Sequence, residues 1–511
     1  MEQPPTSTTH GRSRRARVRR TAALSTGVAT ALAAAILVPT FASAGSEDDS
    51  KPKEPQGPAV KEDFNGDGFQ DMAVGAPGSP SEDSGNAGYV TVFYGTPDGL
   101  DRDNAVTVSQ ATDGVPGDPA PHNHFGQKVA GADLDQDGYT DLAVHVPGAR
   151  QVIVLWGGKT GINGKGSSVI EADEDFGSVG SRLTAGDFNG DGSPDLLMTR
   201  GHERGTYGVL QGPFTRDGEW ADEQQVQLTT GDSEATDILS VTAGDVTGDG
   251  ADDLVVHQVF EEMSLENLFF TGGKDGLTRA EDVSLPHAAA GAIGDFDGDG
   301  HGDLAYREVP GNLIENLPYD EGTVKVVYGT SDGLGNREQT FTQGTPGVPG
   351  TPEEGDQFGA GLSAGDVTGD GVDDLAVAVP FEEVNGQDAA GGFVLLKGSE
   401  SNGLSGSGAQ AFHQDTPGIA GVAEANDLFG GSVRLLDVNG DGKADITAGA
   451  PGEAIGDVAD TGAIWYVPGA ADGLTAEGSN AVNPGEIDAE LPGVRFGTTL
   501  TNSGYAPLPA R

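Results

Sequence analysis

The hydrophobic positions of this chain fall in short runs that are separated by segments rich in Gly, Asp and Pro. The runs come in pairs, and the clearest are MAVGAPG (72–78) with YVTVFYG (89–95), LAVHVPG (142–148) with QVIVLWG (151–157), and LAVAVP (375–380) with FVLLKG (393–398). Runs of this length, rich in Val and bounded by Gly or Pro, predict buried β-strands. A turn such as PDGL (97–100) or ADGL (471–474) follows the second run, and another apolar patch lies beyond it.

An acidic nine-residue segment precedes the first run of each pair and occurs seven times. The copies are DFNGDGFQD (63–71), DLDQDGYTD (133–141), DFNGDGSPD (187–195), DVTGDGADD (245–253), DFDGDGHGD (295–303), DVTGDGVDD (366–374) and DVNGDGKAD (437–445). Four strands in each repeat predict one antiparallel sheet, and seven such sheets around an axis make an all-β, seven-bladed β-propeller. The high Gly content alone is also compatible with disorder, but this periodicity is not.

Two short motifs flank the acidic segments. Phe-Gly lies before them at 125–126, 176–177, 358–359 and 429–430, and Gly-Ala-Pro lies after them at 75–77 and 449–451. The repeat therefore resembles the FG-GAP repeat of integrin α-chain propellers and of many bacterial secreted proteins, and the resemblance covers residues 63–511. The first repeat lacks a Phe-Gly strand, whereas VRFGTTL (494–500) has one without an acidic segment. We expect this C-terminal strand to complete the first blade and close the ring.

Each acidic segment reads D-x-[D/N/T]-x-D-G-x-x-D, with side-chain oxygens at positions 1, 3, 5 and 9. Gly at position 6 permits a sharp turn with positive φ, and the carbonyl of position 7 supplies a fifth oxygen. An all-oxygen set favours calcium over zinc or magnesium. An EF-hand needs Glu at position 12, where the first two copies have Val74 and Val144. The predicted ligand residues are Asp63, Asn65, Asp67, Phe69, Asp71, Asp133, Asp135, Asp137, Tyr139, Asp141, Asp187, Asn189, Asp191, Ser193, Asp195, Asp245, Thr247, Asp249, Ala251, Asp253, Asp295, Asp297, Asp299, His301, Asp303, Asp366, Thr368, Asp370, Val372, Asp374, Asp437, Asn439, Asp441, Lys443 and Asp445.

The seven segments predict up to seven bound Ca²⁺ ions of unequal affinity. Position 3 is Asp in two copies, Asn in three, and Thr at Thr247 and Thr368, where only a hydroxyl is offered. We expect the two Thr copies to bind most weakly. The alternative, a set of metal-free β-turns, leaves three or four carboxylates close together without a counter-charge, which is electrostatically unfavourable.

The composition narrows the range of partners. The formal net charge is −52, so the chain repels nucleic acid and anionic lipid surfaces. There is no Cys, which excludes disulfides, zinc-thiolate sites and thiol catalysis.

The N-terminus predicts export. The basic run RSRRARVRR (12–20) precedes the apolar run 24–44, which ends in Ala42-Ser43-Ala44. This pattern predicts a signal peptide over 1–44, with export through either the general or the twin-arginine route. The polar, Pro-rich residues 45–62 predict a flexible linker, and the mature chain is expected to be extracellular, not inserted in a membrane, and monomeric.

The function is less well determined than the fold. Antiparallel topology places the long segments of blades 5, 6, 7 and 1 at the end opposite the acidic segments, where we expect a non-catalytic binding or adhesion site for an extracellular protein or glycan. The resemblance also leaves open a glycan-active enzyme (lyase or hydrolase) or a lectin; a lyase needs a Lys, Arg, Tyr and His cluster at the axis, and a lectin needs exposed aromatics. Gly231-Asp232-Ser233 and His122-Asn123-His124 are weak catalytic alternatives.

Overall fold

The computed structural model describes residues 61–78, 87–171, 180, 182–199, 206–230, 236–281, 283, 285–489 and 493–505. They belong to one compact unit that spans Lys53–Arg511. The predicted signal peptide and residues 45–60 of the predicted linker lie outside the described residues. No helix in the described ranges is both long and apolar enough to cross a membrane.

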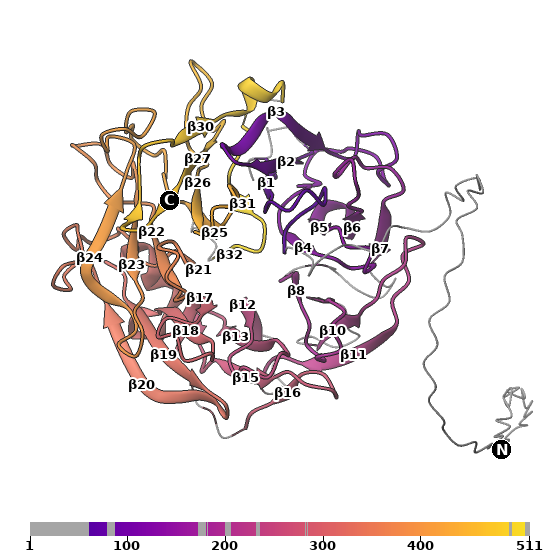
Figure 1. Ribbon diagram of the computed structural model, residues 1–511, viewed down its shortest axis with the longest axis horizontal. Helices are drawn as coiled ribbons and strands as arrows, with labels where there is room; N and C mark the ends of the chain where they lie inside the picture. Colours follow the sequence, from indigo (N-terminus) through magenta and orange to yellow (C-terminus); the bar gives the residue numbers. More distant parts are fainter. Residues whose placement is uncertain are drawn as a thin grey trace, which may run out of the picture. The chain divides into compact units, whose positions relative to one another are not determined.

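Seven antiparallel sheets of four or five strands follow one another around a central axis, which confirms the predicted seven-bladed β-propeller (Figure 1). Blade 1 contains β1 (Met72–Ala76), β2 (Tyr89–Thr96), β3 (Gly99–Val108) and β31 (Thr499–Leu500). Blade 2 contains β4 (Val129–Ala132), β5 (Asp141–Val146), β6 (Gln151–Leu155) and β7 (Ser168–Glu171), with η1 (Pro147–Ala149) between β5 and β6. Blade 3 contains β8 (Thr184–Gly186), β9 (Asp195–Thr199), β10 (Thr206–Gln211) and β11 (Asp222–Gln227).

The remaining four blades follow the same plan with small additions. Blade 4 contains β12 (Thr236–Gly244), β13 (Asp253–Phe260), β14 (Met263–Ser264), β15 (Leu268–Thr271) and β16 (Thr278–Arg279). Blade 5 contains β17 (Ala288–Gly294), β18 (Asp303–Glu308), β19 (Val324–Thr330) and β20 (Gly333–Phe341), with η2 (Pro310–Asn312) and η3 (Ile314–Tyr319) after β18. Blade 6 contains β21 (Gly361–Gly365), β22 (Asp374–Val379), β23 (Gly392–Lys397), β24 (Ser405–Phe412) and β32 (Gly504–Tyr505). Blade 7 contains β25 (Ser432–Leu436), β26 (Asp445–Ala450), β27 (Ala463–Val467) and β30 (Asn480–Val482), with the ribbon β28 (Gly469–Ala470)–β29 (Gly473–Leu474) and η4 (Pro484–Ile487) beside it.

The order of the strands separates two faces of the propeller. In blades 2 to 7 the first strand of the blade along the chain lies on the axial side of the sheet, with only the two-residue β32 beyond it in blade 6, and an acidic segment links this first strand to the second. Because neighbouring strands are antiparallel, all acidic segments reach one end of the ring, which we call the loop face. The connections between the second and third strands, and between blades, reach the other end, which we call the opposite face.

The two ends of the described chain meet in blade 1 and at the axis. The C-terminal strand β31 pairs with β1, with Val74 opposite Leu500, so the C-terminal segment completes the first blade as predicted. The chain then crosses to blade 6, where β32 pairs with β21. Glu62, at the end of the predicted linker, is buried and accepts hydrogen bonds from Arg434 at 2.7 Å and Asn502 at 3.0 Å.

The Phe-Gly motifs lie at the junctions between blades. Phe125, Phe429 and Phe496 are fully buried, and each forms a parallel β-bridge to a glycine of the preceding blade, namely Gly88, Gly391 and Gly462. A Cβ atom on Gly391 would lie only 2.6 Å from the Phe429 amide nitrogen, so glycine is needed there for close approach. The Phe429 ring packs against Trp465 with centroids 5.1 Å apart, and the apolar core therefore runs between blades.

Candidate metal loops

The seven acidic segments have the same local geometry. The carboxylate of position 1 accepts the backbone N–H of position 5 on Oδ1 at 3.0–3.2 Å. Its Oδ2 accepts the N–H of the position-6 glycine at 2.8–3.0 Å. The carboxylate of position 5 accepts the N–H of position 7 at 2.8–3.2 Å. The position-6 glycines all have positive φ, from 83° to 95°, as predicted.

The aspartate at position 9 anchors each loop to its blade. Its Oδ1 accepts the N–H of a glycine near the end of β2, β6, β10, β15, β19, β23 or β27, one in each blade, at 2.8–3.0 Å. Its Oδ2 accepts the N–H of position 2 in six of the loops. Burial raises the pKa of Asp71 and of Asp141 to about 8. This residue therefore has an architectural role besides the ligand role that the sequence predicts.

Neighbouring loops interlock through positions 4 and 7. In six loops position 4 is a glycine with φ near +70°, and the side chain of position 7 from the next loop packs against it. The Phe69 ring, for example, lies against Gly440 and so joins the first loop to the last. The loop at 133–141 has Gln136 instead, with φ +56°, and its amide donates to the Gly192 carbonyl at 3.0 Å and to the Ser193 hydroxyl at 2.8 Å. The side chains of position 7 thus have a packing role that the sequence did not reveal.

Backbone hydrogen bonds also connect the loops into a ring. The N–H of position 8 donates to the carbonyl of position 1 in the preceding loop at five junctions, at 2.7–3.1 Å, with Thr140 on Asp63 as the first case. At the last junction the Asp437 N–H donates to the side-chain oxygen of Gln70 at 2.7 Å, across 367 residues of sequence. Neighbouring loops are therefore in direct contact through the backbone at these junctions.

Position 3 is where the loops differ. The three asparagines, Asn65, Asn189 and Asn439, accept the N–H of position 5 at 2.8–2.9 Å. Thr368 has a buried hydroxyl with no hydrogen-bond partner. The two aspartates, Asp135 and Asp297, each meet an arginine.

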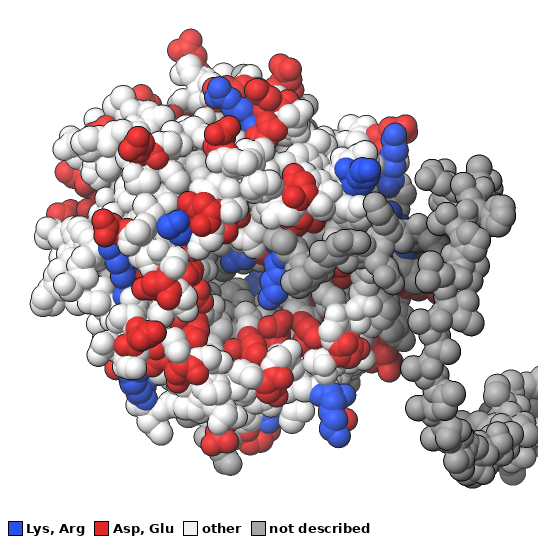
Figure 2. Space-filling model, in the orientation of Figure 1, with Lys and Arg blue, Asp and Glu red and all other residues white. Residues whose placement is uncertain are grey.

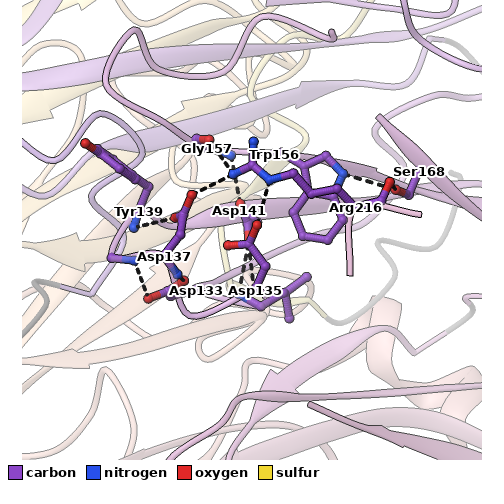
Figure 3. Close-up of polar contacts among 11 residues, drawn as sticks. Asp133, Asp135, Asp137, Tyr139, Asp141, Trp156, Gly157, Ser168 and Arg216 are labelled. Carbon is purple, nitrogen blue, oxygen red and sulfur yellow. Dashed lines mark hydrogen bonds and ion pairs between the residues drawn. The ribbon is translucent and has the colours of Figure 1, made fainter. Parts of the chain in front are cut away.

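Arg216, in the connection between β10 and β11 of blade 3, reaches the loop at 133–141 (Figure 3). Its Nε lies 2.7 Å from Asp135 Oδ2, and its Nη2 lies 2.6 Å from Asp137 Oδ2. The guanidinium also lies over the Trp156 ring, 5.6 Å from its centroid. Trp156 donates to the Ser168 hydroxyl, which in turn donates to the Arg216 carbonyl at 2.7 Å. These contacts fix the arginine in place over the loop.

Arg337, on β20, contacts the loop at 295–303 in the same way. It forms an ion pair with Asp297, whose side chain is only 8% exposed, and lies over the Tyr328 ring at 3.7 Å from the centroid. Both arginines contact Oδ2 of the aspartate, and Oδ1 of Asp135 and of Asp297 is buried without a hydrogen-bond partner. A buried carboxylate oxygen without a partner is unfavourable unless a donor or a cation meets it.

The geometry suits a hard divalent cation. Carboxylate oxygens from three residues lie within 4.8 Å of one another in the first, second and fifth loops: Asp63, Asp67 and Asp71; Asp133, Asp135 and Asp141; and Asp295, Asp297 and Asp299. Each ligand set contains oxygen only, which matches the preference of calcium. Asp135 and Asp297, whose Oδ1 atoms lack a hydrogen-bond partner, both belong to these clusters. The clusters therefore fit a bound cation of this kind.

Comparison with known families identifies the repeats. The FG-GAP repeat family matches residues 59–93, 358–395 and 429–467, and the FG-GAP-like repeat family matches residues 133–198. The chain contains FG-GAP repeats, and they form blades of a β-propeller. Its FG-GAP repeats include the loops at 63–71, 133–141, 187–195, 366–374 and 437–445, and the structure gives the same fold to the two loops outside the matched ranges.

Curated relatives share part of this FG-GAP region. Phosphatidylinositol-glycan-specific phospholipase D of Bos taurus is 32% identical over 145 residues, which is 27% of this chain and 17% of the relative. Integrin alpha-PS5 of Drosophila melanogaster is 42% identical over 93 residues (18% of this chain, 8% of the relative), and human integrin alpha-IIb is 31% identical over 161 residues (29% and 14%). The chain therefore spans less than a fifth of the length of these relatives. A solved protein structure from Lactobacillus plantarum covers 85% of this chain and 99% of its own, at 10% identity and a TM-score of 0.46.

The weak catalytic alternatives gain no support from the FG-GAP structure. Gly231-Asp232-Ser233 lies outside the described residues. His122 and His124 have ring centroids 6.1 Å apart, and His124 Nδ1 is hydrogen-bonded to the Pro77 carbonyl. Asn123 is buried and donates to Gln110 Oε1 at 2.6 Å. These contacts give the segment a structural role in the connection between blades 1 and 2.

Proposed function

We propose that this FG-GAP propeller is an extracellular, non-catalytic module that binds a protein or glycan ligand with its opposite face. The supporting observation is the position of exposed apolar side chains. The large hydrophobic residues that stand out as exposed within the described ranges all lie on the opposite face: Met263, Leu313, Tyr319 and Val422, at 37–69% exposure. Exposed apolar groups gathered on one face are typical of interaction sites.

Three of these four exposed residues lie in the segments predicted to bind a ligand, and the fourth lies beside them. Leu313 and Tyr319 lie in the connection between β18 and β19, and Val422 lies in the connection between β24 and β25, both within the predicted arc. Met263 belongs to blade 4, outside that arc, but it forms a β-bridge with Leu313. The proposed binding surface therefore runs from blade 4 to blade 7.

Calcium is the proposed occupant of the loops, with up to seven ions. Integrin-like FG-GAP relatives are extracellular, where free calcium is abundant, and the predicted signal peptide supports the same location. Bound ions would neutralise part of the carboxylate repulsion and so hold the interlocked loops together. The proposed partners exclude nucleic acid and anionic membranes because of the net charge.

A glycan-active enzyme remains the second candidate because of one observation at the axis. The cavity there is lined by Lys128, His145 and Arg182, which is part of the cluster that a lyase needs. No tyrosine is among the described lining residues. Release of unsaturated or hydrolysed products from a polymer would favour the enzyme.

The proposal is tested by binding of the full-length protein to arrays of extracellular matrix proteins and glycans, in millimolar calcium and in chelator. We expect calcium-dependent binding that weakens at least tenfold for Leu313→Ser/Tyr319→Ser. Lys274→Ser/Asp275→Ser, in an exposed turn of the loop face, is the matched control and should bind like the unaltered protein. The proposed surface would be contradicted if both double variants lost binding equally, or if both bound like the unaltered protein.

A further inference from the structure

The connections of blades 5, 6 and 7 on the opposite face carry a second set of carboxylates, separate from the metal loops. They comprise the segments 342–357, 380–391, 413–428 and 451–462. Each segment contains three Asp or Glu residues and no Lys or Arg. Acidic side chains also cover more of the face in view in Figure 2 than Lys and Arg side chains do. The four segments therefore concentrate negative charge within the predicted binding arc.

At the junction of blades 6 and 7 a buried glutamine joins two of these carboxylates. Gln414 Nε2 donates to Glu453 Oε2 at 2.7 Å. The Asp427 carboxyl, only 2% exposed, is hydrogen-bonded to both of these side chains and accepts the Glu424 N–H at 2.8 Å. Gln414 is 1% exposed, and the Oε1 atom of its amide is buried without a hydrogen-bond partner. The cluster thus combines two carboxyl groups with one unsatisfied acceptor.

The junction of blades 5 and 6 repeats this cluster with Gln343, Asp356 and Glu382. Gln343 Nε2 donates to Glu382 Oε2 at 2.7 Å, and the Asp356 carboxylate accepts the Glu353 N–H at 2.8 Å. Gln343 is 5% exposed, and its Oε1 is again buried without a hydrogen-bond partner. Asp356 and Asp427 each lie two residues before a Phe-Gly motif, so the two clusters are built from equivalent positions.

The junction of blades 1 and 2 shows that the fold does not require these carboxylates. There Asn123 lies two residues before the Phe-Gly motif, and its amide donates to Gln110 Oε1 at 2.6 Å. Ala149 stands where the other two junctions have glutamate, two residues after the proline that ends the second run of the blade. Because a neutral pair fills the same place, the carboxylates of the other two junctions point to a ligand rather than to a need of the fold.

Like charges meet in both acidic clusters. Burial raises the pKa of Asp356 and of Glu453 to about 7, and neighbouring carboxylates add to both shifts. His413, the one histidine of the four segments, is neutral at pH 7 because burial lowers its pKa. Arg307 of β18 is a buried cation near the first cluster, and it lies 3.9 Å from Asp320. A cationic group of a ligand would relieve the repulsion between the clustered carboxylates.

We propose that each cluster binds one Lys or Arg side chain of a basic protein ligand, so that the opposite face carries two equivalent cation subsites. Lys and Arg side chains offer N–H donors and no acceptor, which matches a set of carboxylates with an unsatisfied amide oxygen. Their long apolar stems allow the charged group to reach a half-buried carboxylate. The inference rests on the proposed function and deepens it, because it names the chemical class of the ligand.

Exposed apolar side chains border both subsites and suit a protein surface. Val422 is 65% exposed and lies in the same connection as Asp427. Tyr319 is 69% exposed, and the carbonyl of the next residue, Asp320, accepts the Gln357 N–H at 3.1 Å beside the other cluster. Each cation subsite therefore has an apolar neighbour within the proposed binding surface.

Isothermal titration calorimetry with a hexa-arginine peptide tests the subsites, in millimolar calcium and at physiological ionic strength, where long-range attraction to the acidic surface is screened. Glu382→Gln/Glu453→Gln should weaken binding about tenfold, because each variant site loses a charge-assisted hydrogen bond. A bound cation favours ionised carboxyl groups, so binding at about pH 6.5 should release protons from the unaltered protein and fewer from this variant. Titrations in buffers of different ionisation enthalpy measure that release.

The matched control is Asp98→Asn/Asp332→Asn, which removes the same charge from exposed turns of the loop face and should bind like the unaltered protein. The single variants Glu382→Gln and Glu453→Gln, checked by melting temperature, replace the double variant if it does not fold. Equal affinity of the glutamate variant and the control, or binding without proton release, would overturn the proposal.

The array experiment separates this proposal from the proposed function. Array binding to glycans alone, or to proteins with no preference for basic ones, would refute the cation subsites and leave the opposite-face surface standing. Peptide binding that depends on Glu382 and Glu453, together with array binding that Leu313→Ser/Tyr319→Ser leaves unchanged, would refute the apolar part of that surface alone.

Discussion

The loops at 133–141 and 295–303 carry four aspartates, whereas those at 63–71 and 187–195 carry three aspartates and one asparagine. With Arg216 or Arg337 included, each four-Asp loop has a formal charge of −4 + 1 = −3, which equals that of the two asparagine loops. The extra aspartate is therefore not simply an additional ligand, because one of its oxygens is already engaged by an arginine. Counting aspartates in the sequence misjudges the charge that a bound cation would meet.

The largest effect should come from removing divalent ions from all loops at once. Each site held at a hundredfold excess over its Kd stabilises the fold by about 3 kcal/mol, so loss of the ions from only two filled sites should already lower the free energy of unfolding by about 5 kcal/mol. Thermal unfolding followed by circular dichroism, in calcium and in chelator at equal ionic strength, measures this difference. Superimposable melting curves would remove the proposed structural role of the ions and make the comparison of loops irrelevant.

Exchange of position 4 between the loop at 63–71 and the loop at 133–141 should have the next largest effect. Gly66→Gln forces a side chain into a left-handed position against the Tyr139 ring and should cost about 2 kcal/mol. Gln136→Gly removes two hydrogen bonds, but glycine adopts the positive φ of this position without strain. The free energy of unfolding should therefore fall by about 1 kcal/mol or less. Urea unfolding in calcium measures both. Equal costs would show that the loops do not interlock through this position.

Substitution of Arg216 tests directly whether this arginine equalises the charge of the four-Asp loop and the asparagine loops. Arg216→Gln leaves the loop at 133–141 with a charge of −4, so the ion-free protein should lose about 1 kcal/mol, a small value because Arg216 is half exposed. Calcium affinity of that loop should rise, because the ion no longer competes with the guanidinium. Arg216→Gln/Asp135→Asn recreates an asparagine loop and should restore both values. Calcium titration and unfolding in chelator are the measurements, and weaker calcium binding by Arg216→Gln would mean that the arginine positions the ligands instead.

The smallest effect concerns buried carboxylates that are balanced by a proton rather than by an arginine. Burial, with Asp427 as the next cause, raises the pKa of Glu453 to about 7. Because the folded state then binds more protons than the unfolded state, the stability due to this group falls as pH rises from about 4.5 through about 7. Glu453→Gln should be neutral at pH 4 and stabilising by up to about 1 kcal/mol at pH 8, a discounted value because the group is partly exposed. A pH-independent difference in urea unfolding would contradict this assignment.

The sequence predicted those features that depend on local signals. Alternating apolar runs and turns predicted the blades, the conserved spacing within each loop predicted the positive φ of Gly68 and its counterparts, and the unmatched ends predicted the pairing of β31 with β1. Side-chain contacts between different repeats were not predictable. Nothing near Arg216 indicates that it meets Asp135, 81 residues away. The axial position of Lys128 and Arg182, and the packing of position 7 on the neighbouring loop, follow from ring closure alone.

The most direct test of the account is a crystal structure of the protein in millimolar calcium, with anomalous scattering to locate the ions. We predict peaks enclosed by the oxygens of positions 1, 3, 5, 7 and 9, with the arginines still paired to Asp135 and Asp297. Loops that keep their hydrogen bonds but show no ion at this calcium concentration would contradict the account.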